Sequence, residues 1–404
     1  MLNDIDAEMQ RRHIDGMVVL GDTTLSNPDL TYVVGGSLAR GGIYFKRVSQ
    51  SPLLLTSSLD IQKARKLGRV KKIQTYTDHD FEKLTMQYGR TEAYPRLINH
   101  VLKELGIEGK IVLAGRNDLA SGIHLFSTLR TFGRDITGEA SPTILEHARE
   151  TKSSEEITKI RTVGTKTARV VNSVLDILKD AKRKHGHLWI GKKHATVGSI
   201  RKLIATRFAM ENLTAPEGTI FATGGSSADP HSSGIPSAEI KEGRLIVFDI
   251  FPQSESGYWF DLTRSFTIGK ADRKARHMFE AVNEAQDAAL GLLRDGLPGD
   301  EAMSRACDII ERNGFRTLRD IYQRKMSEPA SGFVHSLGHG VGLTIGERPY
   351  LTFQVKDRLR KGQVVTVEPG VYLPGFGGVR IEDTVTITER GYRNLSHVPK
   401  MLEL

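Results

Sequence analysis

The sequence predicts an α/β domain over residues 1–150, followed by an α+β domain over residues 151–404. Three observations support this fold class. The 404 residues exceed what one ordinary hydrophobic core supports. Helical and strand patterns alternate in the first part, which is typical of helices packed on a mixed sheet. In the second part, helices are mixed with long antiparallel strand patterns.

Short apolar runs mark the strands of the first domain. The segments "MVVL", "GGIYFKR", "SPLLLTS" and "KIVLAG" are typical of buried strands. Before the last of them, "YPRLINHVLKELG" has the spacing of an amphipathic helix that Gly106 ends. A long helix then opens the second domain in "ETKSSEEITKIR", where Ser153 or Ser154 can cap it and acidic residues fill the first turn. We place the domain boundary just before this helix, near residue 150.

Composition excludes several functional classes. Hydrophobic residues make up 39% and charged residues 26% of the chain, as in ordinary soluble globular proteins. No apolar run approaches the ~18 residues that span a bilayer, and the charged N-terminal segment lacks the apolar core of a secretory signal. The single cysteine, Cys307, fits a small buried position on a helix and a reducing compartment. We therefore expect a cytoplasmic protein with no membrane partner.

The net charge of +9 would suit a nucleic-acid-binding protein, but the arrangement of the basic residues argues against one. They are scattered, and no aromatic residues are interleaved with them to stack on bases. We expect no nucleic-acid partner. His185, His187 and His194 gather in one basic segment, and because lysines repel cations the sequence favours a solvated loop over a metal site there.

A first pair of carboxylates is predicted in "GRLIVFDIFPQSESGYWFDLTRSFTIG". Asp249 is embedded in an apolar strand, where a carboxylate is costly unless it is paired or binds a metal. The "SESG" segment is a turn signal, and a hairpin centred on Glu255 would place Asp249 directly opposite Asp261. Like charges directly opposed destabilise a sheet. Two buried aspartates in this arrangement therefore need a cation between them.

The same pattern recurs in "GQVVTVEPGVYLPGFGGVRIEDTVTITE". Glu368 and Glu382 each lie in an apolar strand, on either side of the turn signal "LPGFGG". A hairpin centred on Gly375 would place the two glutamates directly opposite each other. One such acid alone would more often be a surface or salt-bridge residue. Four acids within apolar strands indicate a shared metal site.

The glycine-rich stretch "HSLGHGVGLTIGERPY" supplies an imidazole to this site. It contains His335 and His339, set among glycines that let the backbone approach closely. Two aspartates, two glutamates and one of these histidines would hold two divalent ions. This oxygen-rich set suits Mn²⁺, Co²⁺, Fe²⁺ or Zn²⁺, and two ions roughly 3.5–4 Å apart can activate a water molecule.

These motifs resemble those of the pita-bread-fold metallopeptidases, which include methionine aminopeptidase, aminopeptidase P and prolidase. The matching segments are "FD", "DLTRS", "HSLGHGVGL", "TVEPGVY" and "GGVRIEDTV". By this resemblance the metal ligands are Asp249, Asp261, His339, Glu368 and Glu382. The segment "GSSADPHSSGIP" is similar to the upstream histidine segment of the family. The strong motifs lie within residues 150–404, whereas "PDLTYVVGG" and "ETKSSEEITKIR" more weakly resemble the creatinase and prolidase N-terminal domain.

The resemblance implies a creatinase-like N-terminal domain over residues 1–150 and a pita-bread catalytic domain over residues 151–404. Methionine aminopeptidases lack the first domain and creatinase lacks the ligand set, so the prolidase and aminopeptidase P branch is implied. Its members hydrolyse Xaa-Pro bonds, in dipeptides or at peptide N-termini, by a hydroxide that bridges two metals. Mn²⁺ or Co²⁺ is expected ahead of Zn²⁺ or Fe²⁺. The implied partners are proline-containing peptides and a second copy of the chain in a homodimer.

The resemblance also assigns roles to individual residues. Glu368 would move a proton to the leaving nitrogen, His335 would hydrogen-bond the substrate or the tetrahedral oxyanion, and His231 would contact the substrate near its leaving side. The plainer alternatives are a structural role for His335 and an exposed loop position for His231. Arg380, two residues before Glu382, would either support the site through an ion pair or bind a substrate carboxylate.

One position departs from the family pattern. Peptidases of the family carry a further histidine seven residues after the metal histidine, in "GHGxGLxxHE", whereas this sequence has Gly346 followed by Glu347. That histidine helps to bind the substrate, so its absence leaves the metal ligands complete but affects Xaa-Pro cleavage. Two alternatives follow: another reaction on the same metal site, such as a lyase acting on a small sulfonium acid, or a catalytically weak binding protein.

Overall fold

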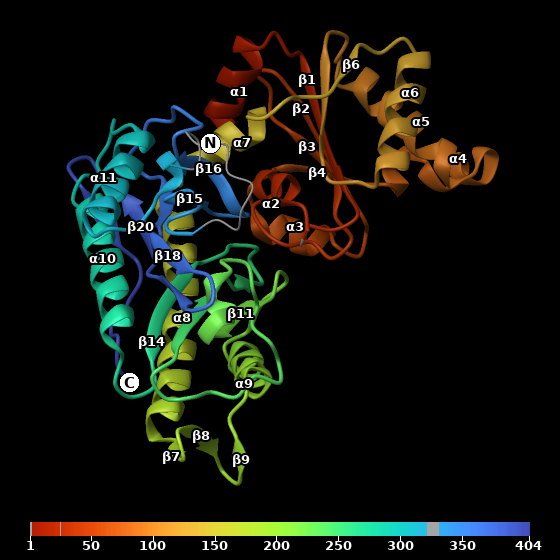
Figure 1. Ribbon diagram of the computed structural model, residues 1–404. Helices are drawn as coiled ribbons and strands as arrows, with labels where there is room; N and C mark the ends of the chain where they lie inside the picture. Colours follow the sequence, from red (N-terminus) through yellow and green to blue (C-terminus); the bar gives the residue numbers. More distant parts are fainter. Residues whose placement is uncertain (1, 25, 321–330) are drawn as a thin grey trace. The chain divides into compact units, whose positions relative to one another are not determined.

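The computed structural model describes residues 2–24, 26–320 and 331–404 (Figure 1). The chain divides into two compact units. One consists of Met1–Arg149 with Glu255–Gly257, and the other of Glu150–Ser254 with Tyr258–Leu404. Within the described residues, no helix is long and apolar enough to cross a membrane.

The first unit is built on a mixed β-sheet with the strand order β4-β3-β2-β1-β5-β6. β1 pairs antiparallel with β2 and parallel with β5. The four predicted strand segments form β1, β2, β3 and β5. Apolar side chains of α5 and α6, such as Leu97 and Leu129, pack in one core with strand residues such as Val18 and Phe45. The predicted α/β architecture is confirmed for this unit.

The elements of the first unit are α1 (Leu2–Arg11), β1 (Gly16–Gly21), α2 (Pro28–Val34), β2 (Gly42–Arg47), β3 (Leu53–Thr56), α3 (Ile61–Leu67), β4 (Lys72–Thr75), η1 (Thr77–His79), α4 (Phe81–Tyr88), α5 (Arg90–Glu104), β5 (Ile111–Gly115), α6 (Leu119–Thr131), β6 (Ile136–Thr137) and α7 (Ile144–Glu150).

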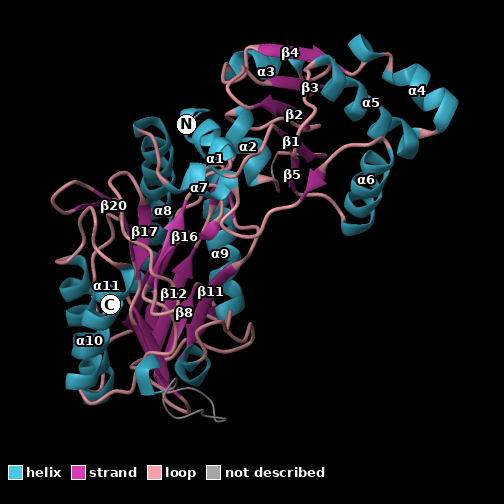
Figure 2. Cartoon of the chain, turned by 90° about the horizontal axis from the view of Figure 1, so that it is seen from above, coloured by secondary structure: helices cyan, strands magenta, loops and turns pink. Residues whose placement is uncertain are grey.

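The second unit combines helices with antiparallel sheets, as predicted. Its larger sheets have the strand orders β11-β12-β14 and β16-β15-β17-β20-β21, and β18 pairs with β19. Helices α10 and α11 lie side by side along the strands (Figures 1 and 2). They bury residues such as Met278, Val282 and Ile310 in one core with Val365 and Val385 of the sheet. This core supports the strands that carry the glutamates identified above.

The elements of the second unit are α8 (Ser154–Asp180), β7 (Lys182–Lys184), β8 (His187–Ile190), β9 (Lys193–His194), α9 (Val197–Met210), β10 (Leu213–Thr214), β11 (Thr219–Thr223), η2 (Gly224–Ala228), β12 (Leu245–Ile250), β13 (Gln253–Ser254), β14 (Leu262–Thr267), α10 (Arg273–Leu290), α11 (Gly299–Arg312), β15 (Gly338–Val341), β16 (Ile345–Leu351), β17 (Val364–Val367), β18 (Gly370–Leu373), β19 (Gly377–Arg380), β20 (Asp383–Ile387) and β21 (Tyr392–Asn394).

Helix α8 begins where the sequence predicts a helix start, and it packs against the segment that contains Asp261. Ser153 and Glu156 form a capping box, in which each side chain accepts a hydrogen bond from the backbone N–H of the other. Farther along the helix, a Cβ placed on Gly164 would lie 2.4 Å from the ring of Phe260. Only glycine allows this close approach, so α8 packs directly against Phe260, the residue before Asp261.

Cys307 is a buried free cysteine of α11. Burial raises the pKa of its thiol to about 11, so the thiol stays protonated at neutral pH. The predicted position of this residue, small and buried on a helix, is confirmed.

Candidate metal centre

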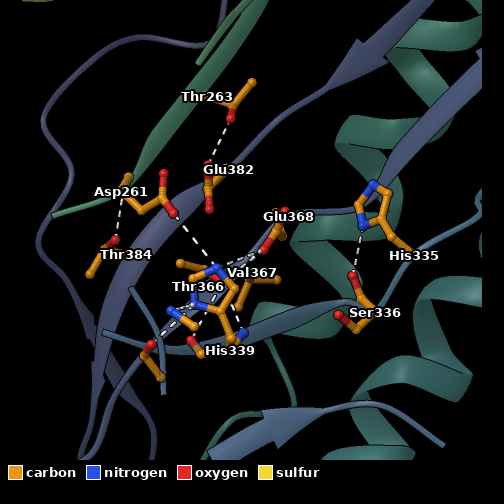
Figure 3. A network of polar contacts seen from close by, with 12 residues as sticks. Asp261, Thr263, His335, Ser336, His339, Thr366, Val367, Glu368, Glu382 and Thr384 are labelled. Carbon is orange, nitrogen blue, oxygen red and sulfur yellow. Dashed lines mark hydrogen bonds and ion pairs between the residues drawn. The ribbon is translucent and has the colours of Figure 1, made fainter. Parts of the chain in front are cut away.

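Five residues that the sequence selects as metal ligands lie at the ends or in the middle of strands of the second unit. Asp249 lies within β12, and Asp261 immediately precedes β14. Glu368 follows β17, Glu382 precedes β20, and His339 lies in β15. Figure 3 shows Asp261, Glu368 and Glu382 around the imidazole of His339.

The predicted register of the first hairpin is wrong by two residues. β12 and β14 are antiparallel, but Asp249 pairs with Thr263 and not with Asp261. The turn is centred one residue later than predicted, because Gln253 bridges Trp259 and the chain reverses around Ser256. Side chains on a strand alternate with a period of two, so this shift keeps Asp261 on the same face as Asp249. The two carboxylates are diagonal neighbours.

The predicted register of the second hairpin is confirmed. Val367 pairs with Asp383 at the end of the β17–β20 ladder, and Gly370 pairs with Arg380 at the start of the β18–β19 ladder. Glu368 and Glu382 lie opposite each other in the gap between these two ladders. The interruption turns both glutamates toward His339 while the flanking pairs hold the backbone.

The ligand atoms of the site are close together. One atom each of Asp261, His339 and Glu382 lies within 4.8 Å of the others. His339 Nε2 is 3.6 Å from Asp261 Oδ2 and 3.4 Å from Glu368 Oε1. His339 Nδ1 lies 3.0 Å from the Gly340 carbonyl oxygen, and the Gly346 backbone N–H donates to it at 3.2 Å. These backbone contacts orient the imidazole so that Nε2 faces the carboxylates.

Three buried carboxylate oxygens of the candidate metal ligands have no hydrogen-bond partner within the described part of the chain. They are Asp249 Oδ1, Asp261 Oδ1 and Glu382 Oε1. The other oxygens are held in place: Thr263 Oγ1 donates to Glu382 Oε2 at 2.7 Å, and Thr366 Oγ1 donates to Glu368 Oε1 at 3.1 Å. Unpaired buried acceptors are costly. Divalent cations bound among these residues would satisfy the three oxygens, so these residues fit a metal pair.

The carboxylates strongly perturb one another. Burial raises the pKa of Glu368 to about 8, and the neighbouring Asp249 adds to this effect. Burial also raises the pKa values of Asp261 and Glu382, and each is raised further by nearby carboxylates. A bound cation reverses this effect, because it favours the ionised form of each ligand.

The metal-free protein should therefore lose stability as the pH rises. Between the ordinary pKa of 4.5 and the folded-state pKa of about 8, Glu368 binds a proton in the folded state but not in the unfolded state. The free energy of unfolding should fall across this interval by an amount on the order of a few kcal/mol. Denaturant titrations of chelator-treated protein at the two ends of the interval measure the fall. Added Mn²⁺ should reduce it, and equal metal-free stability at both pH values would contradict the arrangement.

His335 belongs to a hydrogen-bonded chain beside the carboxylates. Its Nδ1 lies 2.8 Å from the Ser336 carbonyl oxygen, so Nδ1 carries the proton, and its Nε2 lies 3.0 Å from the Tyr372 hydroxyl. Arg380 donates to the same hydroxyl at 2.6 Å. Burial and the charge of Arg380 lower the pKa of His335 to about 3, so the ring is neutral. In Figure 3 this ring is turned toward Ser336, apart from the His339 cluster.

Arg380 is 4% exposed and forms a buried ion pair with Asp249. Its remaining donors reach Tyr372, the Thr263 hydroxyl at 3.3 Å and the Pro230 carbonyl oxygen at 3.4 Å. Of the two predicted alternatives, this geometry favours the ion pair over a substrate carboxylate, because protein groups already engage the guanidinium. The predicted substrate-binding role of Arg380 stays a prediction.

The site opens into a cavity of about 300 Å³. His231 is exposed and lies on the cavity wall, and its backbone N–H donates to Asp229 Oδ1 at 2.9 Å. The cavity therefore brings together every residue predicted for the site. It is lined by Glu217, Ile220, Pro230, His231, Asp249, Phe251, Asp261, His335, Ser336, His339, Ile345, Glu368, Arg380 and Glu382.

The loop between β15 and β16 carries the position that departs from the family pattern. Gly346 has a φ of +74°, and a Cβ there would have no atom within 4 Å among the described residues. The next residue, Glu347, forms a buried ion pair with Lys152 at 2.7 Å and accepts a hydrogen bond from Thr344 Oγ1 at 2.9 Å. The loop is thus anchored, and the left-handed backbone at Gly346 disfavours any side chain there.

Motif reasoning alone missed three residues of the site: Thr263, Thr366 and Tyr372. Alternation along a strand could have found two of them. Thr263 lies two residues after Asp261 and Thr366 two residues before Glu368, so each shares a face with its carboxylate. Tyr372 gives no comparable signal, because its contact with His335 depends on how two distant segments pack.

Comparisons with known proteins agree with the predicted family and fold. The sequence profile described as "Metallopeptidase family M24" matches residues 158–389. A Xaa-Pro dipeptidase of Pyrococcus horikoshii is 28% identical over 98% of this chain and 96% of that protein. A Xaa-Pro dipeptidase of Pyrococcus furiosus is 39% identical over 46% of this chain, and that match covers only 48% of the length of the relative. The structure of a Xaa-Pro dipeptidase from Bacillus anthracis, 22% identical, has a TM-score of 0.78 and covers 100% of this chain and 99% of that chain.

Proposed function

Because the chain belongs to metallopeptidase family M24, we propose that it is a metal-dependent peptidase that hydrolyses Xaa-Pro bonds, in dipeptides or at peptide N-termini. The names of the two Pyrococcus relatives support this substrate class. The observation that carries the proposal is the convergence of unpaired buried carboxylate oxygens on His339. In this proposal the second unit is the pita-bread catalytic domain and the first is a creatinase-like domain.

Two divalent ions would be held by Asp249, Asp261, His339, Glu368 and Glu382. Oxygen-rich ligands with one imidazole suit Mn²⁺ or Co²⁺, with Zn²⁺ or Fe²⁺ as alternatives. When bound, such a pair supplies a Lewis acid and lowers the pKa of water. Thr263 and Thr366 would fix the orientation of Glu382 and Glu368 through their short hydrogen bonds.

Glu368 is the residue we propose to move the proton. It is largely buried, it lies beside His339 at the cavity, and Thr366 holds only one of its oxygens among the contacts described. A carboxylate placed in this way can take a proton from the nucleophile and return it to the leaving nitrogen. The general acid–base role therefore does not require another titrating side chain.

The chain Arg380–Tyr372–His335 would orient the substrate side of the site. Because Nδ1 of His335 carries the proton, its Nε2 accepts from Tyr372, and the Tyr372 hydroxyl accepts from Arg380. For His335 to donate to the substrate or its oxyanion, as the family resemblance implies, the imidazole would have to exchange this partner. His231, at the cavity wall, would contact the substrate directly.

The experiment that tests the proposal is an assay of reconstituted protein. Chelator-treated protein is supplied with Mn²⁺ or Co²⁺ and assayed on Ala-Pro, Met-Pro and a longer peptide with Xaa-Pro at its N-terminus, with Ala-Ala as the control dipeptide. We expect metal-dependent release of the Xaa residue. Comparison of the dipeptides with the longer peptide separates a dipeptidase from an aminopeptidase. Stoichiometric metal binding without turnover of any proline peptide would overturn the proposal and favour another reaction on this centre.

Replacing Gly346 by histidine should lower the stability of the protein and leave the amount of bound metal unchanged. A residue with a Cβ at a φ of +74° costs about 1–2 kcal/mol. Gly346→Asn should cost less, because asparagine tolerates this region better. Bound metal per chain should be unchanged in both variants. Denaturant titrations and metal analysis test this, and a stable Gly346→His variant with raised Xaa-Pro hydrolysis would show that the site lacks only this imidazole.

The proposal also includes an oligomeric state and a cellular compartment. We propose a homodimer, as the family resemblance implies, and a reducing cytoplasmic setting that suits the buried free thiol of Cys307. Light scattering on a size-exclusion column measures the first. A monomer at micromolar concentration would contradict it.

A further inference from the structure

A second group of potential metal ligands lies on the sheet β7-β8-β9, at residues that the cavity does not include. His187 is the first residue of β8 and His194 the last residue of β9, while Glu239 lies on a separate segment. The sequence favours a solvated loop for these histidines. That description fits only His185, which is exposed at the turn between β7 and β8, whereas His187 and His194 are partly buried.

The three side chains point at one another. His194 Nδ1 lies 2.6 Å from Glu239 Oε1, and His187 Nδ1 lies 2.7 Å from Glu239 Oε2. The two imidazoles are stacked, with their centroids 5.0 Å apart. One ligand atom of each residue lies within 4.8 Å of the others. The Glu239 carboxylate is thus held between two imidazole nitrogens.

The strand pairing places the three side chains on the same face of the sheet. Antiparallel bridges join His187 to Lys241 and Thr196 to Glu239. Because side chains repeat on one face every two residues, Glu239 shares the face of His187, and His194 shares the face of Thr196. Backbone hydrogen bonds fix the segment on both sides, from Leu188 N to Ile240 O at 3.0 Å and from Ile240 N to Ala195 O at 2.9 Å.

One imidazole nitrogen of the cluster has no full partner. His187 Nδ1 is buried, and despite its closeness to Glu239 it makes no well-directed hydrogen bond to any described residue. Its nitrogen is therefore directed into the cluster without a full partner.

We propose that His187, His194 and Glu239 form a second metal site that binds one Zn²⁺ per chain. Two imidazoles and one carboxylate are a ligand set that zinc prefers, with water in the fourth position. Metal–ligand bonds of about 2.0–2.1 Å in a tetrahedron separate the ligand atoms by about 3.3 Å. The present contacts would have to open by about 0.6 Å, which these partly exposed side chains allow.

The neighbouring lysines do not prevent this binding. Lys182, Lys184 and Lys241 are all exposed, so water and salt screen their charges within about 8 Å. Glu239 places a negative charge within the cluster itself, 2.6 Å from His194 Nδ1 and 2.7 Å from His187 Nδ1. Repulsion by these lysines lowers the zinc affinity without removing the ligands.

Zinc at this position would tie the β8–β9 hairpin to the segment that follows His231. Glu239 lies eight residues after His231, which is on the wall of the cavity. The loop between them contains Gly234, with a φ of +84°, and the exposed Ile235 and Pro236. Zinc would add to the backbone hydrogen bonds that hold the far end of this loop and would further restrict the loop that carries His231. The site would therefore stabilise the fold near the cavity without touching the catalytic residues.

The test counts zinc in paired variants of the full chain. Chelator-treated wild-type protein and the Asp261→Asn variant, each with and without His194→Ala, are dialysed against Zn²⁺ and analysed for bound metal. Glu239→Gln is a second variant that preserves the shape of the cluster, and His185→Asn is the matched control in the same hairpin. Circular dichroism confirms that each variant is folded.

We expect His194→Ala and Glu239→Gln each to lose one zinc per chain, whether or not Asp261 is present, and His185→Asn to lose none. Zinc should also raise the thermal midpoint of Asp261→Asn, but not that of Asp261→Asn with His194→Ala. Equal zinc content with and without His194 would overturn the proposal. Because the readout is a difference between paired proteins, it does not depend on the metal pair at the first site.

Discussion

The Asp261→Asn variant should lose metal binding and peptide hydrolysis while its metal-free form becomes more stable at pH ~8. Asp261 is 5% exposed, and one of its oxygens has no partner among the described residues. Removing a direct ligand should lower metal affinity by more than the ~100-fold that loss of an outer hydrogen bond causes. The amide replaces the carboxylate without a change of volume, and the backbone stays held by the hydrogen bond from Thr384 Oγ1 to Asp261 O at 2.8 Å.

The gain in metal-free stability has an electrostatic cause. Burial raises the pKa of Asp261, followed by the charges of Glu382, Asp249 and Glu368. Removing one charge from this cluster relieves the others. Metal analysis, kcat/KM on Ala-Pro and denaturant titrations test the prediction, with Asp272→Asn as a control, because asparagine caps α10 as well as aspartate does. A metal-free Asp261→Asn protein less stable than wild type at pH ~8 would contradict the clustered carboxylates.

Replacing Arg380 by methionine should destabilise the metal-free protein by about 3–5 kcal/mol, because the substitution breaks a buried ion pair and leaves Asp249 without its cation. Arg380→Lys keeps the charge but cannot reach Asp249, Tyr372, Thr263 and Pro230 together, so it should restore only part of the loss. Bound metal should reduce the deficit, since the ions supply positive charge to Asp249. Both variants should lower kcat/KM, because the Tyr372–His335 pair loses its donor.

Arg264 provides a matched comparison for this prediction. It is as buried as Arg380, at 4% exposure, and pairs with Asp383 at 2.7 Å, but it does not line the cavity. It donates to the Glu382 backbone oxygen at 2.6 Å, and none of its described contacts is with a carboxylate of the five predicted ligands. Arg264→Met should therefore be destabilising to the same extent with and without Mn²⁺. Denaturant titrations of both methionine variants, with and without the metal, measure the difference. If Mn²⁺ changes the two deficits equally, the link between Arg380 and the metal centre is wrong.

Much of the fold could be predicted because the relevant signals are local. The capping box at Ser153, the apolar strand runs of the first unit and the turn at Gly375 each depend on a few neighbouring residues. The five-ligand motif identified the family, and the comparisons confirm both the family and the two-part fold. These features require no knowledge of how distant segments pack.

The remaining errors arise where long-range packing decides the outcome. The Asp249 hairpin was predicted from its turn residues, but the pairing of Gln253 with Trp259 moves the reversal and shifts the register. The basic segment around His194 was predicted as a solvated loop from its lysines, because nothing in the sequence connects it to Glu239. The Tyr372–His335 contact is absent from the sequence prediction for the same reason, because it joins two segments that are far apart in the chain. Residues that act together but are far apart in sequence need the fold to reveal them.

The gap between the β17–β20 and β18–β19 ladders limits how this hairpin can change in length during evolution. Glu368 and Glu382 face each other only while the two strands keep equal numbers of residues on either side of the gap. A single inserted residue between a glutamate and its ladder would turn that carboxylate to the opposite face. Insertions confined to the tip around Gly375, where φ is +79°, would leave both glutamates in place. Length variation among functional descendants of this sequence should therefore accumulate at the tip and be absent beside the ligands.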